Sequence, residues 1–312
     1  MRKQKLILLV GLPASGKSVY AKEYLRTHDN TVVVSTDRIH SDIKELGIQI
    51  KSAEDIFREI KHRVRKSLLF GKNVIVNATN LKIEYRESFI KMARKVNKDI
   101  SIEAHVIVAD FDDCVERDAK REKSLGIDFL KKQMGTFQIP VMEEGYSAIE
   151  YYYTSSEDNN LEDINIKDIV LLLRSGVYKK MNCDSLGQAL SILMEETKAP
   201  EYVVKAAYLS LLGRAITSGQ DYAQCGAYLL LCQLLKVKKL SQKNLQTVRN
   251  TWLNIIKLIN YSTLPLNFSK KHEKLFGGDF ILHIKLISGR LRCINNVEKI
   301  KAIFKEYYGD KE

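Results

Sequence analysis

The amino-terminal part of the chain has the residue spacing of a phosphate-binding loop. The loop consists of Gly11, Leu12, Pro13, Ala14, Ser15, Gly16, Lys17 and Ser18. It follows the apolar run Leu6–Val10 and leads through Val19 into a helix-compatible stretch that ends near Leu25. A GxxxxGKS loop turns successive backbone N–H groups inward, and the helix behind it adds the positive end of its dipole. A tight strand-to-helix turn with a chance lysine is the alternative, but the whole pattern predicts a site for a nucleoside triphosphate.

The same loop predicts roles for its side chains. Lys17 is expected to contact the β- and γ-phosphates, and the Ser18 hydroxyl is expected to ligate the Mg²⁺ that comes with the nucleotide. The expected nucleotide contacts are Gly11, Pro13, Ala14, Ser15, Gly16, Lys17, Ser18 and Val19. ATP and Mg²⁺ are therefore the expected cofactors.

An aspartate follows the next strand-like run. Asp37 comes two residues after the run Thr31–Ser35, and the carboxyl ends of parallel strands converge on one crevice. There the carboxylate could accept the proton of an attacking hydroxyl or help to hold Mg²⁺. An N-cap of the helix that follows is the other interpretation, because Asp favours that position.

A third polar group ends another strand-like run. Asn77, Ala78, Thr79 and Asn80 close the run that begins at Asn73, and they are expected to face the same crevice. Thr79 and Asn80 could orient a substrate there. An N-cap or an Asx-turn explains these two residues equally well, so both interpretations remain open.

Two arginines after the fourth strand-like run could close over a triphosphate. Arg117 and Arg121 are four residues apart in the helix-like stretch from Asp112 to Arg121, so they would share one helical face. Guanidinium groups there would neutralise the charge that develops during phosphoryl transfer. A solvated charged helix face is the common alternative for such a run.

These residues need a frame of strands and helices to hold them. Short aliphatic or β-branched runs predict strands over 6–10, 31–35, 73–77 and 102–108, with an edge strand over 148–153. Amphipathic stretches predict helices over 18–26, 53–70, 84–96 and 112–121. This alternation predicts an α/β fold, a P-loop parallel sheet with helices on both faces.

The chain beyond residue 153 has a different pattern. Residues 154–165 begin with a polar run that lacks apolar periodicity, which predicts a linker after a first domain of residues 1–153. Apolar residues at helical spacing then predict helices over 169–173, 185–196, 202–212, 225–235 and 245–259. Residues 166–312 are therefore expected to form an all-α second domain.

Composition narrows the class of protein. With 312 residues, 45% of them hydrophobic, the chain is long enough for two soluble domains. A net charge of +12 favours an anionic partner such as nucleic acid. Five cysteines without CxxC spacing favour a reducing, cytoplasmic compartment. The apolar runs are too short for a membrane span of ~20 residues, so no membrane partner is expected, and the amino-terminal run is also too short for a signal peptide.

The order of these motifs resembles the kinase domain of bacteriophage-type polynucleotide 5′-kinases. The resemblance covers roughly residues 5–153 and includes Gly126-Ile127-Asp128 and Glu144-Gly145-Tyr146. It implies a polynucleotide 5′-hydroxyl kinase that transfers the γ-phosphate of ATP to the 5′-OH end of RNA or DNA, for example in nucleic-acid repair. It also makes Asp37 the general base and Arg121 the lid arginine on the ATP phosphates, with Arg117 as its support. Lys17, Asp37 and Arg121 are thus the expected catalytic residues.

Two positions depart from that family's pattern on the acceptor side. The family has an arginine three residues after the catalytic Asp, where this chain has His40 and carries Arg38 instead. The family also often has an acidic residue before its Thr-Asn pair, where this chain has Ala78. Arg38, His40, Thr79 and Asn80 are expected to contact the acceptor. A nucleoside or nucleotide sugar stays open as an alternative acceptor.

Short segments of the helical part are similar to HD-domain metal phosphohydrolases. Where that family has its metal ligands, this chain has Ser210-Leu211, Tyr222, Ser262 and Gly289. These side chains do not replace imidazole and carboxylate ligands, which predicts a degenerate HD-like domain that supplies a binding surface. An unrelated helical bundle is the alternative. A domain without chemistry of its own also keeps a non-catalytic, ATP-gated binding module among the hypotheses.

Two basic stretches could contact a nucleic-acid backbone. One is the helical stretch from Arg58 to Lys66, and the other runs from Lys270 to Lys299. Phosphate contacts come mainly from Arg and Lys. For the first stretch, a solvated outer face with its apolar residues packed inward is the competing interpretation. The oligomeric state stays open.

Overall fold

The computed structural model describes residues 3–45, 52–155, 164, 200–217, 219, 221–237 and 242–263. The helices expected over 169–173 and 185–196 lie outside these residues, as do Gly289, most of the expected linker and the basic stretch from Lys270 to Lys299. Within the described part of the chain, none of the helices combines the length and the hydropathy that a bilayer crossing requires.

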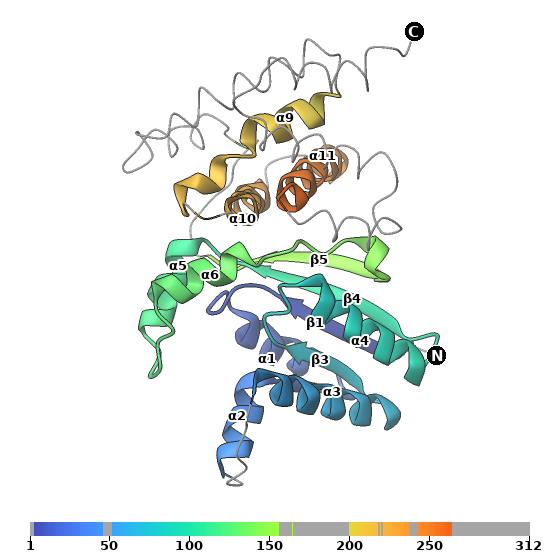
Figure 1. The fold of residues 1–312 in the computed structure, drawn as a ribbon. Helices are drawn as coiled ribbons and strands as arrows, with labels where there is room; N and C mark the ends of the chain where they lie inside the picture. Colours follow the sequence, from blue (N-terminus) through green and yellow to red (C-terminus); the bar gives the residue numbers. More distant parts are fainter. Residues whose placement is uncertain are drawn as a thin grey trace. The chain divides into compact units, whose positions relative to one another are not determined.

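Five parallel strands form one sheet in the order β2-β3-β1-β4-β5 (Figure 1). The strands are β1 (Lys5–Val10), β2 (Thr31–Ser35), β3 (Asn73–Asn77), β4 (Ser101–Val108) and β5 (Ala148–Tyr153). β1 lies in the centre, where Leu8 is opposite Val76 on one side and Ala104 on the other. β1, β3 and β4 are buried almost throughout, as expected for strands that are covered on both faces. The strands are those predicted from the sequence, which confirms the parallel P-loop sheet of an α/β fold.

Helices cover both faces of this sheet. They are α1 (Lys17–Thr27), α2 (Thr36–Glu45), α3 (Ala53–Leu69), α4 (Ile83–Val96) and α5 (Phe111–Ala119). On one face α1 packs Ala21 against Ile7 and Leu9. On the other face α3 and α4 pack against Leu6 and Leu8 (Figure 1), because alternate side chains of a strand point to opposite faces. The connections from β1 to α1, from β2 to α2 and from β3 to α4 all lie at the carboxyl edge of the sheet, where the predicted site residues gather.

α5 ends earlier than the sequence predicts, and this moves Arg121 off the helix. The helix ends at Ala119, although the amphipathic pattern continues to Arg121. The buried Asp118 carboxylate explains the early end, because it accepts a hydrogen bond from the Ser124 hydroxyl at 2.8 Å and two more from the backbone N–H groups that follow, at 2.8 and 3.1 Å. These bonds draw the chain into a turn. The expectation that Arg117 and Arg121 share one helical face is therefore wrong.

The chain divides into two compact units, and one segment does not follow the expected boundary. The first unit contains residues up to Gly126 together with Pro140–Ser155. The second contains Ile127–Ile139 together with the described residues after Ser155. It therefore includes α6 (Ile127–Gly135), which lies within the sequence range expected for the first domain.

Buried contacts hold the Ile127–Ile139 segment within the helical unit. The helical unit also contains α9 (Glu201–Leu209), α10 (Tyr222–Lys236) and α11 (Gln242–Tyr261), as the helical spacing predicted. The Asn260 side chain donates to the Phe137 carbonyl at 2.8 Å and accepts from the Ile139 N–H at 3.0 Å. The Tyr261 hydroxyl donates to the Ile139 carbonyl at 2.6 Å. Buried backbone groups need such partners, and α11 supplies them.

A fully buried ion pair lies between α4 and the turn before β5. Arg86 contacts both carboxylate oxygens of Glu144 at 2.7 and 2.8 Å, and both side chains are 0% exposed. Glu144 belongs to the short helix η1 (Met142–Glu144). Arg86 also donates to the carbonyl oxygens of Asn80 at 3.0 Å and Leu81 at 2.9 Å. Because each partner satisfies the buried charge of the other, the pair fixes the loop after β3 against the turn before β5.

Loss of one partner of this pair should destabilise the protein strongly. We expect Glu144→Ala to lower the free energy of unfolding by about 3–5 kcal/mol, because it leaves the Arg86 charge buried without compensation. Urea denaturation of the full chain measures the change. The control Glu116→Ala removes an exposed pair with Lys120 and should cost less than about 1 kcal/mol. Similar losses in the two variants would contradict this account.

Candidate active site

The phosphate loop has the backbone geometry that its sequence predicts. Ala14 and Gly16 have positive φ angles of 60° and 94°, a conformation in which neighbouring N–H groups turn toward a common centre. Gly11 has no room for a side chain, because a Cβ atom there would lie 2.2 Å from the carbonyl oxygen of Ile107. Position 11 thus needs glycine for space and position 16 favours it for conformation.

Polar groups of the loop are left open, as a phosphate site requires. The Ser15 hydroxyl is buried and has no hydrogen-bond partner among the described residues. No side chain in that part of the chain caps the first turn of α1, so the N–H groups of this turn lack intrahelical partners. A buried polar atom without a partner costs free energy, and the phosphate oxygens of a nucleotide would supply the partners. The loop residues therefore fit a triphosphate.

Lys17 lies buried at the start of α1 with its ammonium group inside the loop. Its Nζ atom donates to the carbonyl oxygen of Gly11 at 3.0 Å and to that of the next residue. Burial lowers the pKa of Lys17 to about 8; Cys114 opposes this shift, Arg121 adds to it, and Asp37 opposes it. The main cause of the lowered pKa is thus the burial of the ammonium group.

The Ser18 hydroxyl lies beside the end of β3. The Asn77 side chain donates to the Ser18 oxygen at 3.1 Å. A hydroxyl oxygen has two lone pairs, so one stays available to a cation. Mg²⁺ keeps several waters and takes few protein ligands. Ser18 together with the nucleotide phosphates fits this coordination preference.

Asp37, Arg38 and His40 lie in the first turns of α2, directly after β2. α2 begins at Thr36, so Asp37 lies inside the first turn and not at the N-cap. All three predicted side chains are exposed, whereas Ile39 between them is buried. No hydrogen bond or ion pair within the described residues occupies the Asp37 carboxylate, which leaves it accessible to an acceptor hydroxyl.

Thr79 and Asn80 connect the end of β3 to the phosphate loop. The Thr79 carbonyl accepts a hydrogen bond from the Gly11 N–H at 3.1 Å. The Asn80 side chain is buried and donates to the Leu9 carbonyl at 2.8 Å. Its amide therefore positions the strand end from which the loop starts. Contact of either residue with an acceptor stays a prediction.

Arg117 reaches the loop through Thr154, which follows β5. Arg117 donates to the Thr154 carbonyl at 2.8 Å, and the Thr154 hydroxyl donates to the Ser15 carbonyl at 2.8 Å. The Thr154 side chain also lies against Gly16, where an added Cβ would be 3.3 Å from it. This arrangement makes Arg117 a support for the wall of the loop.

Arg121 is more open than Arg117. It lies beyond the end of α5, its side chain is 43% exposed, and it pairs with Asp118 at 3.7 Å. Burial acts to raise the pKa of Asp118, but the hydrogen bonds from Ser124 and from the backbone that follows lower it on balance, with Arg121 adding to this. A charged Asp118 therefore pairs with Arg121 without enclosing it.

The sequence analysis places Asn77 at this crevice without a role of its own, and it does not predict Thr154 as part of the site. Asn77 closes β3 and contacts Ser18, and Thr154 follows β5 and contacts Ser15. Both carry the signal that singled out Asp37, a polar side chain at the carboxyl end of a strand. Thr154 was assigned to the expected linker because the residues after it are polar.

The positions compared with HD-domain metal ligands lie at helix ends. Ser210 follows α9, Tyr222 begins α10 and Ser262 follows α11, and all three are buried. The Ser210 and Ser262 hydroxyls donate to backbone carbonyls three residues earlier, each at 2.8 Å. The HD-like relationship stays a prediction.

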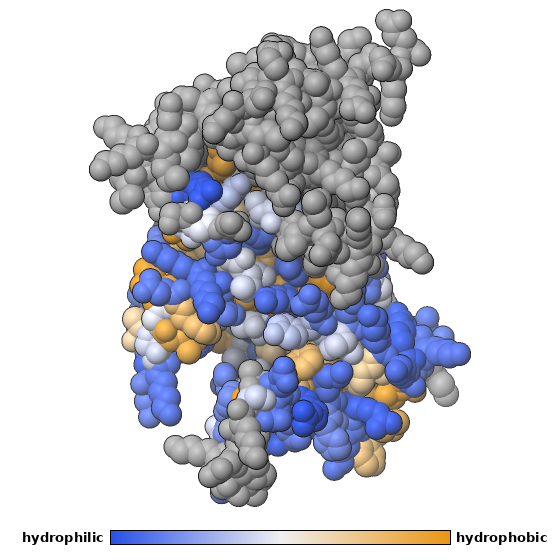
Figure 2. Space-filling view, viewed as in Figure 1, coloured by the Kyte–Doolittle hydropathy of each residue, from blue (hydrophilic) through white to orange (hydrophobic). Residues whose placement is uncertain are grey.

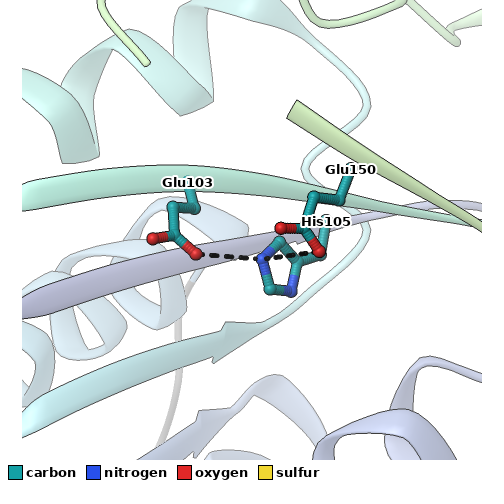
Figure 3. Close-up of side chains that lie close together, drawn as sticks. All are labelled: Glu103, His105 and Glu150. Carbon is teal, nitrogen blue, oxygen red and sulfur yellow. Dashed lines mark hydrogen bonds and ion pairs between the residues drawn. The ribbon is translucent and has the colours of Figure 1, made fainter. Parts of the chain in front are cut away.

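A second cluster contains ligand types that could hold a metal ion. Glu103, His105 and Glu150 come from the neighbouring strands β4 and β5 (Figure 3). The Nε2 atom of His105 lies between the two carboxylates, 3.2 Å from Glu103 and 4.0 Å from Glu150. The cluster lies on the sheet face that α1 covers, because Tyr20 of α1 contacts the other ring nitrogen of His105 at 2.7 Å.

Hydrogen bonds satisfy this cluster without a cation. Lys5 contacts Glu103 at 2.8 Å and brings a positive charge to it. If the Tyr20 hydroxyl donates to Nδ1 of His105, the neutral ring carries its proton on Nε2 and donates it to Glu103. A metal would need that same nitrogen deprotonated. We therefore interpret the cluster as a buried charge network that joins β1, β4 and α1.

This network should make stability depend on pH in the acid range. The hydrogen bond from His105 lowers the pKa of Glu103 from 4.5, burial opposes this, and Lys5 lowers it again, to about 2. A carboxylate with a lowered folded pKa stabilises the protein above its unfolded pKa, and this contribution is lost as pH falls toward 2. We expect the free energy of unfolding to decrease by up to about 3 kcal/mol over this range from Glu103 alone.

Denaturation at a series of pH values measures this effect. The Glu103→Gln variant should show a flatter dependence between pH 4.5 and 2, whereas Glu23→Gln, which removes an exposed pair with Arg26, should keep the wild-type slope. An unchanged slope in Glu103→Gln would show that this carboxylate does not titrate as described.

The pKa of Lys17 predicts how nucleotide binding changes with pH. Only the ammonium form of Lys17 attracts phosphates. Because the pKa of Lys17 is about 8, most Lys17 side chains are deprotonated at pH 9. We expect the dissociation constant for a non-hydrolysable ATP analogue with Mg²⁺ to rise about tenfold from pH 7 to pH 9, measured by calorimetry. Lys17→Met should bind weakly at both pH values. A wild-type affinity that is equal at pH 7 and 9 is the contrary result.

Comparisons with known proteins agree with the phosphate loop. Residues 6–140 match the family described as an AAA domain. Transcription factor bHLH140 of Arabidopsis thaliana is 26% identical over 196 residues, which cover 60% of this chain and 20% of that protein. The chain thus spans about a fifth of the length of this curated relative.

Solved structures with similar chains come from different kinds of protein. A chain of the Pnkp1/Rnl/Hen1 RNA repair complex is 27% identical, with 44% of this chain and 45% of that chain covered and a TM-score of 0.38. A gluconokinase from Sinorhizobium meliloti 1021 is 17% identical, with 50% of this chain and 86% of that chain covered and a TM-score of 0.36. The family match, the GxxxxGKS loop and the parallel sheet together show a P-loop α/β domain in the amino-terminal part of this chain.

Proposed function

We propose that this protein is an ATP-dependent kinase that phosphorylates the 5′-hydroxyl end of RNA or DNA. The observation that carries the proposal is the geometry of the loop. The Lys17 ammonium group lies inside it together with the buried Ser15 hydroxyl, which lacks a partner among the described residues, while the exposed Asp37 lies in the first turn of α2 at the same edge of the sheet. A lysine on the phosphates, a carboxylate for the incoming hydroxyl and an arginine for the developing charge are the groups that phosphoryl transfer needs.

The proposed reaction uses these groups in defined roles. The 5′-oxygen of the acceptor attacks the γ-phosphorus of ATP, the bond from that phosphorus to the bridging oxygen of ADP breaks, and Asp37 accepts the hydroxyl proton. Lys17 and Arg121 stabilise the negative charge on the transferred group and on the leaving phosphate. Mg²⁺, with Ser18 as its protein ligand, would supply further charge neutralisation on the phosphates.

Charge and motif order support a nucleic-acid acceptor. The chain has a net charge of +12, and polyanions are favoured partners of such proteins. The exposed Arg38 and His40 flank Asp37 on α2, where they are available to the phosphates that follow a 5′-end nucleoside. The resemblance of the motif order to polynucleotide 5′-kinases favours the same acceptor.

Asp37→Asn should separate catalysis from nucleotide binding. We expect the rate of phosphate transfer from labelled ATP to a 5′-OH oligonucleotide to fall at least about 100-fold, because a general base contributes 10²–10⁴. The dissociation constant for ATP should change little, since no hydrogen bond or ion pair in the described part of the chain joins the Asp37 carboxylate to the loop. Asp29→Asn, an exposed carboxylate before β2, is the matched control and should retain wild-type rates. Full activity in Asp37→Asn would remove Asp37 from the mechanism.

A small-molecule hydroxyl is the second candidate acceptor. His40 and Ala78 favour it, because they stand where polynucleotide kinases carry an arginine and an acidic residue. The same labelled-ATP assay with nucleosides and nucleotide sugars decides between the two. Phosphorylation of these compounds without any transfer to oligonucleotides would establish this candidate and reject the first.

A further inference from the structure

α3 and α4 form a groove on the sheet face opposite to α1. Both helices pack on that face through one apolar cluster (Figure 1). The groove has a volume of about 470 Å³. Its walls carry Lys61, Arg65, Lys91 and Lys95, and its apolar lining includes Leu69 and Met92. Figure 2, drawn from the same side, shows this face as hydrophilic with apolar patches.

The groove has an excess of positive charge. Lys91 pairs with Glu87 at 2.9 Å on its own helix. No carboxylate in the described part of the chain pairs with Lys61, Arg65 or Lys95, and no acidic side chain lines the groove there. Three cations on facing helix walls without counter-charges create a field that attracts an anion.

The positive charges form one row on each of the two helices. Lys61 and Arg65 are four residues apart on α3, and Lys91 and Lys95 are four residues apart on α4. Residues four apart lie one above the other on a helix, about one turn or ~5.4 Å along its axis. A row of charges on each wall matches a chain of phosphates better than a single phosphate group.

Aromatic rings lie at one end of these rows. The Phe57 and Tyr85 ring centroids are 5.2 Å apart, and Tyr85 is 46% exposed. The Lys61 ammonium group lies 5.8 Å from the Phe57 centroid, which makes the rings continuous with the charges. Tyr85 is in the first turn of α4, shortly after the Asn80 loop at the carboxyl edge of the sheet. Exposed aromatic rings beside a basic groove are the means by which proteins bind single-stranded nucleic acid without sequence preference.

We propose that the α3–α4 groove binds the sugar-phosphate backbone of a single-stranded nucleic acid, with a base stacked on Tyr85. The inference rests on the proposed function in one respect: the bound nucleic acid would be the acceptor, held downstream of the 5′-end that reaches Asp37. Lys61, Arg65 and Lys95 would contact successive phosphates. The apolar lining would contact sugars or bases.

Binding of a 20-nucleotide 5′-OH oligonucleotide, labelled at its 3′-end, to the full chain tests this proposal by fluorescence anisotropy. We expect Arg65→Ala/Lys95→Ala to weaken binding about tenfold, and to lower the slope of log affinity against log salt by about 1.4, since each lost phosphate contact removes about 0.7. The matched control Lys22→Ala/Arg26→Ala removes the same charge from exposed positions of α1 and should keep the wild-type slope. Equal effects of the two double variants would overturn the proposal.

Three further measurements separate this proposal from its alternatives. If Arg65→Ala/Lys95→Ala raises the KM for the long oligonucleotide but not for a dinucleotide or ATP, the groove acts on the acceptor as proposed. If the wild type phosphorylates no polynucleotide but oligonucleotide binding still depends on Arg65 and Lys95, the groove proposal stands and the proposed function fails. Binding of polyglutamate as tightly as the oligonucleotide, with the same loss in the variant, would reject nucleic acid as the specific occupant.

Discussion

The buried Arg86–Glu144 ion pair is the interaction on which the geometry of the phosphate site depends. Arg86 holds the carbonyl oxygen of Asn80, and the Asn80 side chain in turn holds the carbonyl of Leu9, the second residue before the loop. Glu144 lies in the turn that precedes β5, at whose end Thr154 contacts the Ser15 carbonyl. One buried pair thus connects to both walls of the loop. Such a pair adds little net stability over apolar packing, but its loss is costly because a single charge is left buried.

The site itself is held in a state that a ligand would stabilise. The ammonium group of Lys17 is buried, so its pKa is lowered, and the Ser15 hydroxyl has no partner in the described residues. Both features cost free energy in the free protein. A nucleotide that pairs with these groups would offset that cost and raise the stability of the folded protein by mass action. The tight packing around Arg86 and the open loop are therefore complementary parts of one unit.

The sequence predicted the sheet well because its strands are buried on both faces and appear as short apolar runs. It also predicted the loop, because glycine spacing there answers to local geometry. The sequence analysis failed where a side chain bonds to the backbone of a turn or to backbone far away in the sequence. The amphipathic pattern could not show that Asp118 ends α5 before Arg121. Nor could it show that Ile139 is bonded to Asn260 and Tyr261, which lie more than a hundred residues away. The sequence analysis did not place Thr154 in the site, because a polar residue that makes a specific contact cannot be distinguished from its neighbours within a polar stretch.

The two glycines of the loop and its polar residues are required for different reasons. Packing against the Ile107 carbonyl demands glycine at position 11, and the positive φ angle favours glycine at position 16, whether or not a nucleotide ever binds. Ser15 and Lys17 are the opposite case, because a bound phosphate would give the Ser15 hydroxyl a partner and the buried Lys17 ammonium group a counter-charge. In a descendant that had lost the activity, selection for stability would keep the glycines and replace Ser15 and Lys17. The presence of Ser15 and Lys17, rather than the glycine spacing, therefore distinguishes a loop that binds phosphate from one that has lost this activity.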